Sequence, residues 1–431
     1  MQRRFLLSGL LAVLALSAAA CADETPTLTG EEQFPPGSIP VTREITFPAS
    51  EFIRTLGSFR GYSRGADLPF MVVANQFDEG LDAHALARFS GFPTLVTYRR
   101  ENLERRDSLF TYAGSRLVMR VDTSATSEGP FTLQVWEAAQ DWDRQTATWT
   151  TAIDTGSVQQ PWTEPGGTRG ALLGQATFNR TAAEGDSVVV TLTGAAVTAL
   201  ADSASRGVIV TTSSEGSRVE LFEMVLRAAV KPDSALPDTT IFVTVATQGT
   251  RTTVYTPEQP DPGPGMLAAG GVLGARTLLE INADRRVPAC AEGETCGTLP
   301  LDSVRLNQVQ LLLRPAPVPA GFDPLTFVPL SMRLVDEPEL GGDAPVGPRV
   351  LDVDPGRQSQ VYFYAPGDTV VILPITTVAR NEALSDSIPR TYMLMSEVAG
   401  NSVPSTFGVA FFQPEPRLRI IYTLPARRRL P

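Results

Sequence analysis

Histidine, lysine and cysteine are scarce in this chain of 431 residues, which has one histidine, His84, one lysine, Lys231, and three cysteines. A single histidine excludes a metal site built from several histidines and leaves only His84 for a histidine-based triad. We expect His84 to be structural or exposed. Acidic residues outnumber basic ones by 47 to 36, so the chain has no surface suited to a phosphate backbone. The sequence therefore predicts no nucleic-acid partner and no cofactor.

Long apolar runs are also missing, and the longest is the short run over residues 5–16. It is too short to span a bilayer, which needs about 20 apolar residues. It follows Arg3 and Arg4 and leads into Ala18-Ala19-Ala20-Cys21, the pattern of a secretion signal that ends in a lipobox. We predict that residues 1–20 are removed and that Cys21 carries a lipid. Ordinary cleavage near Ala20, with an unmodified cysteine, is the alternative.

The lipid would make a membrane the first partner of this protein. Acyl chains contribute about 0.8 kcal/mol for each CH₂ that enters the bilayer. Lipoproteins retained at the inner membrane often have aspartate after the cysteine, whereas this chain has Ala22. This favours a lipid-anchored protein of the outer membrane. Residues 21–40 are acidic, contain four prolines and lack apolar periodicity, so we expect a flexible tether.

The other two cysteines, Cys290 and Cys296, flank the turn-like stretch Ala-Glu-Gly-Glu-Thr. In an exported protein this spacing favours a local disulfide, worth about 2 kcal/mol for so short a loop. A zinc site is not expected, because the chain has too few further cysteines and histidines to complete it.

Short runs of β-branched and apolar residues between turns predict an all-β protein with tandem antiparallel β-sandwich domains. The 35 prolines and 35 glycines agree with many turns. The predicted strands are residues 187–192, 208–212, 219–226, 241–245, 309–313, 370–373, 391–395 and 418–422.

An internal duplication divides the chain. Residues 185–190 (GDSVVV) are echoed by 367–372 (GDTVVI), and each copy continues with a short helical stretch and a strand. Residues 115–120 similarly match 308–314, and 131–136 match 327–335. We predict a first sandwich over 41–255, a Pro/Gly linker over 256–265 that acts as a stiff spacer, a second sandwich over 266–425 and a basic tail over 426–431.

All four tryptophans fall between residues 136 and 162. The order of motifs is Leu133-Gln134-Val135-Trp136, Trp142-Asp143, Thr148-Trp149, Trp162-Thr163-Glu164-Pro165-Gly166-Gly167, Val190-Thr191 and Gly207-Val208-Ile209-Val210, with Pro416-Arg417-Leu418 closing the second copy. This order resembles the DNRLRE-type modules, which are related to disaggregatase-associated domains. The resemblance implies a jelly-roll-like sandwich of secreted and surface proteins, often attached to polysaccharide-active enzymes. It covers residues 80–230 best; the second copy has no tryptophan, and Asp143 stands where the family often has glutamate.

The tryptophans are the first candidates for a ligand site, since aromatic rings stack on sugars. We expect Trp136 and Trp149 to belong to the core, where burial of one ring removes about 150–250 Å² from water. Trp142 and Trp162 lie beside turns and charge and are the candidate ligand-binding residues. Asp141-Trp142-Asp143 lacks the spacing of an EF-hand loop, so we expect these acids to be solvated, although calcium binding stays open.

Gly61-Tyr62-Ser63-Arg64-Gly65 fits the Gly-x-Ser-x-Gly elbow of serine hydrolases, but Pro69 opposes the helix that must follow it. We therefore predict no catalytic residues. The favoured function is a non-catalytic surface lipoprotein that binds polysaccharide or another envelope component. The alternatives are a structural or assembly lipoprotein that contacts envelope proteins, and a hydrolase that uses carboxylates or Ser63.

Overall fold

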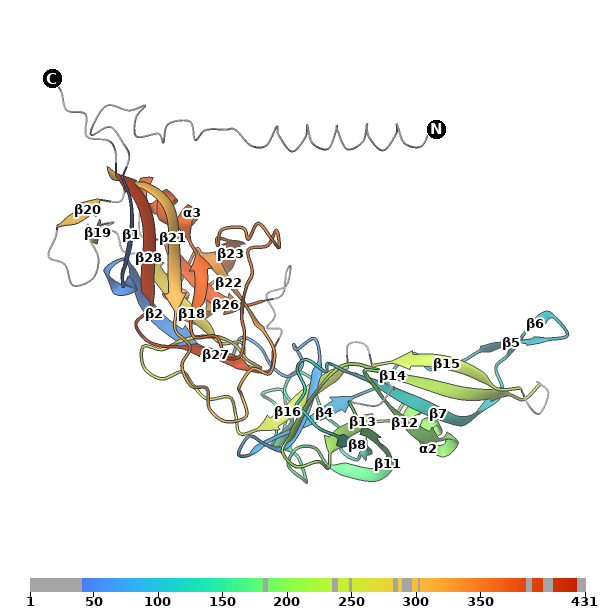
Figure 1. The fold of residues 1–431 in the computed structure, drawn as a ribbon. Helices are drawn as coiled ribbons and strands as arrows, with labels where there is room; N and C mark the ends of the chain where they lie inside the picture. The colour runs from blue at the N-terminus through green and yellow to red at the C-terminus, as the bar shows by residue number, and fades with distance from the viewer. Residues whose placement is uncertain are drawn as a thin grey trace, which may run out of the picture.

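The structure, a computed structural model, describes residues 41–180, 185–234, 239–247, 250–281, 286–288, 297–300, 303–384, 390–397 and 406–424. These residues form two lobes that lie end to end (Figure 1). Lobe 1 consists of strands β3 to β16, and lobe 2 consists of β1, β2 and β17 to β28. Antiparallel sheets dominate both lobes, which confirms the predicted all-β sandwich fold.

Lobe 1 folds one ten-stranded antiparallel sheet over its core, and β3 pairs with β4 within it. The two halves on either side of this pair have the orders β3–β14–β7–β12 and β4–β13–β8–β11. In these orders, the strands are Met71–Phe77, Ser217–Pro232, Phe110–Val121 and Ser187–Thr193, then Leu81–Ala87, Val208–Thr212, Phe131–Ala138 and Arg169–Phe178. β15 (Ile241–Ala246) pairs with β14, and β16 (Arg251–Thr256) pairs with β4. Eight strands paired in this way make a jelly roll.

Lobe 2 repeats the arrangement in the orders β1–β28–β21–β25 and β18–β26–β22, with β23 and β24 both paired to β22. The first sheet contains Val41–Pro48, Arg417–Leu424, Arg305–Leu313 and Val371–Pro374, and the second contains Arg276–Ile281, Thr391–Ser396, Val328–Val335, Val346–Arg349 and Tyr362–Tyr364. β2 (Ile53–Phe59) pairs with β18 in the place that β16 takes beside β4 in lobe 1.

Short elements complete the fold. The hairpins are β5 with β6 (Val96–Arg100, Leu103–Asp107), β9 with β10 (Thr151–Asp154, Gln159–Pro161) and β19 with β20 (Arg286–Pro288, Thr298–Pro300); β17 pairs with β27 (Leu267–Gly270, Val409–Phe412). The helices are α2 (Gly194–Ala201), α3 (Thr376–Leu384) and the 3₁₀ turns η1 (Ala49–Glu51) and η3 (Pro338–Asp343).

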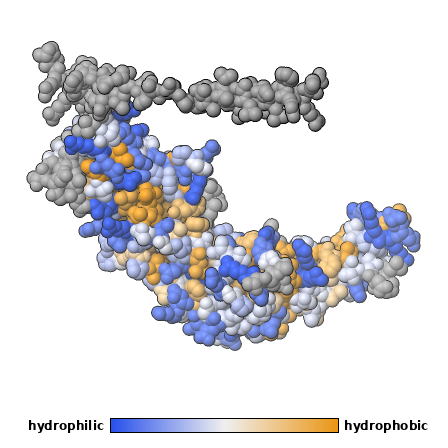
Figure 2. Space-filling model, viewed as in Figure 1, coloured by the Kyte–Doolittle hydropathy of each residue, from blue (hydrophilic) through white to orange (hydrophobic). Residues whose placement is uncertain are grey.

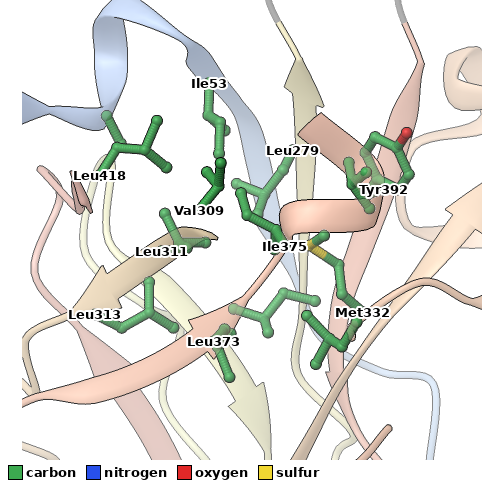
Figure 3. Packing of buried hydrophobic residues seen from close by; sticks show 14 of the residues in the cluster. Ile53, Leu279, Val309, Leu311, Leu313, Met332, Leu373, Ile375, Tyr392 and Leu418 are labelled. Carbon is green, nitrogen blue, oxygen red and sulfur yellow. The ribbon is translucent and has the colours of Figure 1, made fainter. Parts of the chain in front are cut away.

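Alternating side chains account for the sheets. On β12, Val188, Val190 and Leu192 are buried and the residues between them are exposed or half-buried, the period of two expected for a strand with one face on the core. Figure 3 shows the same principle in lobe 2, where Val309, Leu311 and Leu313 of β21 point together into the core.

The predicted duplication occupies equivalent positions in the two lobes. β12, α2, β13 and β14 are repeated as β25, α3, β26 and β28, and β7 and β8 are repeated as β21 and β22. The strand order agrees as well. β14 lies between β3 and β7 in lobe 1, and β28 lies between β1 and β21 in lobe 2.

The predicted domain boundaries need correction. The first sandwich does not begin at residue 41, because β1 pairs with β28 and β2 pairs with β18, so residues 41–59 belong to lobe 2. Lobe 1 is therefore inserted into lobe 2 between β2 and β18. Neither β1 nor β2 is among the predicted strands, and a local sequence pattern does not identify a partner hundreds of residues away.

Residues 256–265 are not a free spacer either. Gln259 is buried, and its Oε1 accepts a hydrogen bond from the Leu273 amide at 2.9 Å. Arg60 donates to the Gln259 carbonyl and to the carboxylates of Glu258 and Asp261. The linker is thus fixed to the segment that leaves lobe 2 after β2.

The lobes meet through strands that are buried on both faces. On β3, Met71 and Val73 face the core of lobe 1, while Val72 and Ala74 face lobe 2. On β27, Ala410 and Phe412 face the core of lobe 2, whereas Val409 and Phe411 face lobe 1. Phe322 and Phe407, stacked with 5.7 Å between ring centres, fill the space between them.

Arg218 on β14 lies in the same interface and has no exposed surface. Its Nη1 donates to the Gly321 carbonyl at 2.9 Å, and its guanidinium lies over the rings of Phe77 and Phe407. The amide of Gly321 donates to the Asp78 carboxylate at 2.8 Å. Two charged side chains of lobe 1 therefore hold one backbone unit of lobe 2.

We expect Phe407→Ala to destabilise the protein by about 3–5 kcal/mol, because it removes a buried ring from the interface. Each lobe keeps its own core, so thermal unfolding should separate into two transitions, measurable by scanning calorimetry. The matched control is Phe131→Ala, which removes an equally buried ring from inside lobe 1. A Phe407→Ala protein that melts like the wild type would contradict the role of this interface.

Candidate functional site

The chain between β8 and β11 makes a long excursion, residues 139–168, that contains three of the four tryptophans. On β4, Ala85 and Ala87 point into the core of lobe 1, so His84 and Leu86 point to the outer face of the sheet. The excursion covers this outer face. Leu86 packs there with Ile209 of β13 and Val254 of β16 in a second, smaller apolar cluster, which also contains the tryptophans.

Trp142 and Trp162, the predicted ligand-binding residues, lie inside this cluster with 2% and 6% of their surfaces exposed. The indole N–H of Trp142 donates to the Arg206 carbonyl and that of Trp162 to the Thr148 carbonyl, each at 2.9 Å. Arg88 covers one face of Trp142 at 4.6 Å. Neither ring is free to stack on a ligand, so that prediction is corrected.

The two tryptophans expected in the core are the ones that remain partly exposed. Trp136 donates its indole N–H to Thr211 Oγ1 at 3.1 Å and lies under the guanidinium of Arg169. Trp149 is at the rim of the excursion, immediately before β9, and lines a cleft. The reversal arises because exposure here depends on how the excursion folds back, which the sequence pattern does not reveal.

The cleft has a volume of about 660 Å³. It is lined by the excursion from Gln145 to Thr150, by β16 from Thr253 to Thr256, and by Arg64, Asp154, Glu258 and Leu273. Tyr255 links it to the lobe interface, since its ring centre lies 5.4 Å from that of Phe407 and 6.1 Å from that of Phe322. The cleft therefore lies at the lobe junction, where ligand pockets commonly form.

Polar groups are distributed around the aromatic walls. Arg64 Nη1 donates to the Gln145 carbonyl at 2.7 Å, which holds one cation at the mouth of the cleft. Asp154 and Glu258 supply carboxylates, and Glu258 accepts from Arg60 Nη1 at 3.2 Å. Burial raises the pKa of Tyr255, so its phenol stays neutral and able to donate or accept. No sequence motif points to Asp154, Tyr255 or Glu258, and Arg64 is only an intervening residue of the Gly-x-Ser-x-Gly segment.

The imidazole ring of His84 packs against the indole ring of Trp149. Its ring centre is 4.8 Å from that of Trp149, at an interplanar angle of 48°, and its Nδ1 lies 2.7 Å from the Gly166 carbonyl oxygen. A carbonyl only accepts, so Nδ1 carries the proton. Burial lowers the pKa of His84, which keeps the ring neutral near pH 7. Gly166 permits this contact, because a Cβ there would lie 2.7 Å from both rings.

The Gly-x-Ser-x-Gly segment is structural. Turns and bends, not a helix, follow Gly65, and the buried Ser63 Oγ has no hydrogen-bond partner among the described residues. A Cβ at Gly65 would lie 2.0 Å from the Thr253 carbonyl, so glycine lets this loop pack on β16 and place Arg64 at the cleft. His84 bonds to Gly166 instead of Ser63.

The acidic patch around Trp142 has internal partners. Asp141 accepts from Arg88, and Asp143 Oδ1 accepts from the amides of Gln145 and Thr146 at 3.0 and 2.9 Å. Across the described residues, no group of three or more histidine, cysteine, aspartate or glutamate side chains could hold a metal ion. Cys21, Cys290 and Cys296 lie outside the described residues, so lipidation and the disulfide stay predictions.

Among the helices that the structure describes, none combines the length and apolar character needed to cross a membrane.

Comparison with known proteins identifies no family for this chain. No family model matches it, and no curated protein sequence matches it. A solved structure of a candidate secreted protein from Parabacteroides distasonis is 9% identical, with 88% of this chain and 99% of that chain covered and a TM-score of 0.20. The C-terminal domain of the Streptococcus agalactiae AgI/II polypeptide BspA is 10% identical, over 72% of this chain and 75% of that one, with a TM-score of 0.13. Neither likeness carries an argument about this protein.

We expect the stability of lobe 1 to depend on His84 protonation. As the pH falls below about 6.5, His84 binds a proton in the unfolded chain, whereas in the folded state it stays neutral until a lower pH. The free energy of unfolding therefore decreases by up to about 1.4 kcal/mol for each pH unit. His84→Gln should lack this component, and urea unfolding at pH 5 to 8 should show its difference from wild type shrinking towards pH 5.

The opposite pH dependence comes from Glu220, whose pKa burial raises to about 8. The contribution of Glu220 to the free energy of unfolding declines as the pH rises from about 4.5 to 8. This contribution is the same in the wild type and in His84→Gln, so it cancels in the difference between them. A difference that stays constant with pH would contradict the role of His84.

Proposed function

We propose that this protein is an exported lipoprotein of the cell envelope that binds glycan, without cleaving it, in the cleft at the lobe junction. The observation that carries the proposal is the position of Trp149: partly exposed, supported by His84 and forming one wall of a cleft of about 660 Å³. A sugar presents an apolar ring face and hydroxyl edges, which match an aromatic wall bordered by a few polar groups.

The polar groups favour a ligand with many hydroxyls. Thr146, Thr148, Thr150 and Thr253 line the same space as Trp149, and Tyr255 adds a neutral phenol. Arg64 donates, while Asp154 and Glu258 accept. One cation beside two carboxylates leaves no strong preference for a charged ligand, so a neutral glycan fits the cleft best.

The carboxylates favour binding over hydrolysis. A glycosidase needs one carboxyl group that remains protonated to act as a general acid. Glu258 Oε1 instead accepts a hydrogen bond from Arg60 Nη1 at 3.2 Å. Asp154 Oδ1 accepts from the Gly156 amide at 3.2 Å and so holds the turn of the β9–β10 hairpin. Both carboxylates therefore have binding and structural roles.

The envelope location rests on the amino-terminal residues. The short apolar run, the three alanines and Cys21 support export and lipidation, and Ala22 supports the outer membrane. The resemblance to DNRLRE-type modules is consistent with a surface protein that contacts polysaccharide, and membership of that family is part of the proposal. A structural or assembly lipoprotein is the alternative, and the free edge strand described below favours it.

We expect Trp149→Ala to weaken glycan binding at least tenfold, a loss of about 1.4 kcal/mol, because it removes the stacking surface. The purified protein would be screened on a glycan array, and the strongest ligands measured by calorimetry. Trp136→Phe is the matched control, since Trp136 belongs to the same cluster but does not line the cleft. Absence of glycan binding, or binding that survives Trp149→Ala, would remove the proposed ligand.

Lipidation has a separate test. We expect Cys21→Ser to move the protein from the membrane fraction to the soluble fraction and to abolish incorporation of radiolabelled palmitate, because the thiol is the attachment point of the lipid. Cys290→Ser should change neither result. A wild-type protein whose mature amino-terminal peptide has the mass of an unmodified cysteine would exclude the anchor.

A further inference from the structure

The edges of the sheets are protected in most places. An exposed edge strand has unpaired backbone groups that pair readily with another chain, and proteins block such edges with charge, proline, irregularity or a covering segment. β1 has Arg43, Glu44 and Pro48, and β16 has Arg251. β2 has Arg54 and a register shift between Thr55 and Gly57. β23 consists of Val-Gly-Pro-Arg, and the four-residue β25 ends in Pro374.

β12 and β11 protect each other. β12 has neither charge nor proline in Ser-Val-Val-Val-Thr-Leu-Thr, but β11 lies directly against it. A Cβ at Gly174 of β11 would lie 2.7 Å from Val190 Cγ1 and 2.9 Å from the Thr191 carbonyl oxygen. β11 itself is irregular, with register shifts on both sides of Leu172.

β15 has none of these protections. It is the six-residue run Ile-Phe-Val-Thr-Val-Ala, with no charge, proline or glycine. It pairs with β14 from Ile241↔Val230 to Ala246↔Val225, and no strand pairs with its other edge among the described residues. Phe242 is 61% exposed beside the small Ala229 of β14. Figure 2 shows hydrophobic residues gathered over this part of lobe 1, which points away from lobe 2.

We propose that β15 is a dimerisation edge, on which a second copy of this chain adds its own β15 in antiparallel orientation. The two sheets then become one continuous sheet through a two-fold axis, as in other isologous interfaces. This inference is independent of the glycan cleft and of the lipid anchor, since it uses neither.

A second copy fits this edge because the strand is complementary to itself. Antiparallel pairing of two β15 strands places only Ile, Phe, Val, Thr and Ala side chains opposite one another, so no like charges meet. This matters in a chain with a net charge of −11, because two copies have net charges of the same sign and an uncharged edge brings no like charges into contact. Each copy also covers the exposed Phe242 of the other.

The geometry restricts the pairing register. A two-fold axis perpendicular to the sheet keeps the outer face of one copy on the outer face of the pair, so side chains of that face meet only side chains of the same face. Three of the registers that this allows place Phe242 opposite Phe242, Phe242 opposite Thr244, or Thr244 opposite Thr244. A single six-residue strand buries less surface than the 1,200–2,000 Å² of a standard interface. The dimer is therefore weak and concentration-dependent.

Cysteine cross-linking of the full chain tests the pairing. Three combinations of variants test the three registers. They are Phe242→Cys alone, Thr244→Cys alone, and the two variants co-expressed with different tags. Under mild oxidation, at least one combination should give a disulfide-linked dimer on a non-reducing gel. Val189→Cys is the matched control, because Val189 is 45% exposed on β12, at the covered edge of the same sheet. The wild type controls for the three native cysteines.

A charge substitution provides the second measurement. Phe242→Lys places two ammonium groups close together across the two-fold axis, and it should raise the dimer dissociation constant at least tenfold in analytical ultracentrifugation of the full chain. Val189→Lys should leave that constant unchanged, and circular dichroism should show that both variants stay folded.

Three results would overturn the proposal. These are a wild-type chain that stays monomeric at every concentration tested, cross-linking that is as strong at Val189 as at β15, and adducts whose mass is that of β15 joined to a different protein. The last result would identify β15 as an edge for another partner.

Discussion

The structure depends on apolar strands that are buried on both faces at the lobe junction. β3 contributes to the core of lobe 1 with one face and to the lobe interface with the other, and β27 does the same for lobe 2. Burial contributes roughly 25 cal/mol for each Å² of apolar surface removed from water, so these strands couple the two cores. Arg218 and Asp78 add hydrogen bonds to the backbone of Gly321 at this otherwise apolar contact between the lobes.

The candidate cleft is a product of this junction. Tyr255 packs its ring on Phe322 and Phe407 of lobe 2 and still reaches the cleft wall. The loop with Gly65 and Arg64 follows β2 of lobe 2 and closes on β16 of lobe 1. Residues 145–150 and 253–256 of the lining belong to lobe 1, and the loop between the lobes adds Arg64 and Gly65.

Local features of the fold could be predicted from the sequence. The run of β-branched residues in β12 and the echo of Gly185-Asp186-Ser187 by Gly367-Asp368-Thr369 identified a strand and a repeat, because both depend on neighbouring residues. The pairing of β1 with β28 could not be predicted, because alternation along a strand determines which faces are buried but not which strand is the partner. The run Met71-Val72-Val73-Ala74 did contain a signal, because continuous apolar residues are typical of strands buried on both faces.

The tryptophans show the same limit within the site. The sequence analysis divided the four rings between a core and a ligand site, whereas all four share one apolar cluster. Gly166 has a φ of +82°, and a Cβ there would lie 2.7 Å from both His84 and Trp149. Composition and spacing do not reveal such a contact, because it depends on how the loop folds back.

The insertion of lobe 1 into lobe 2 has a consequence for the order in which the protein is assembled. Of the described strands, β1 is the first to leave the ribosome and its partner β28 is the last, so lobe 2 stays open while lobe 1 already has all its strands. A chain that stops before residue 417 would leave β1 and β21 without the strand between them. Its unpaired strand edges would then be available to other chains, which makes such a fragment prone to aggregation.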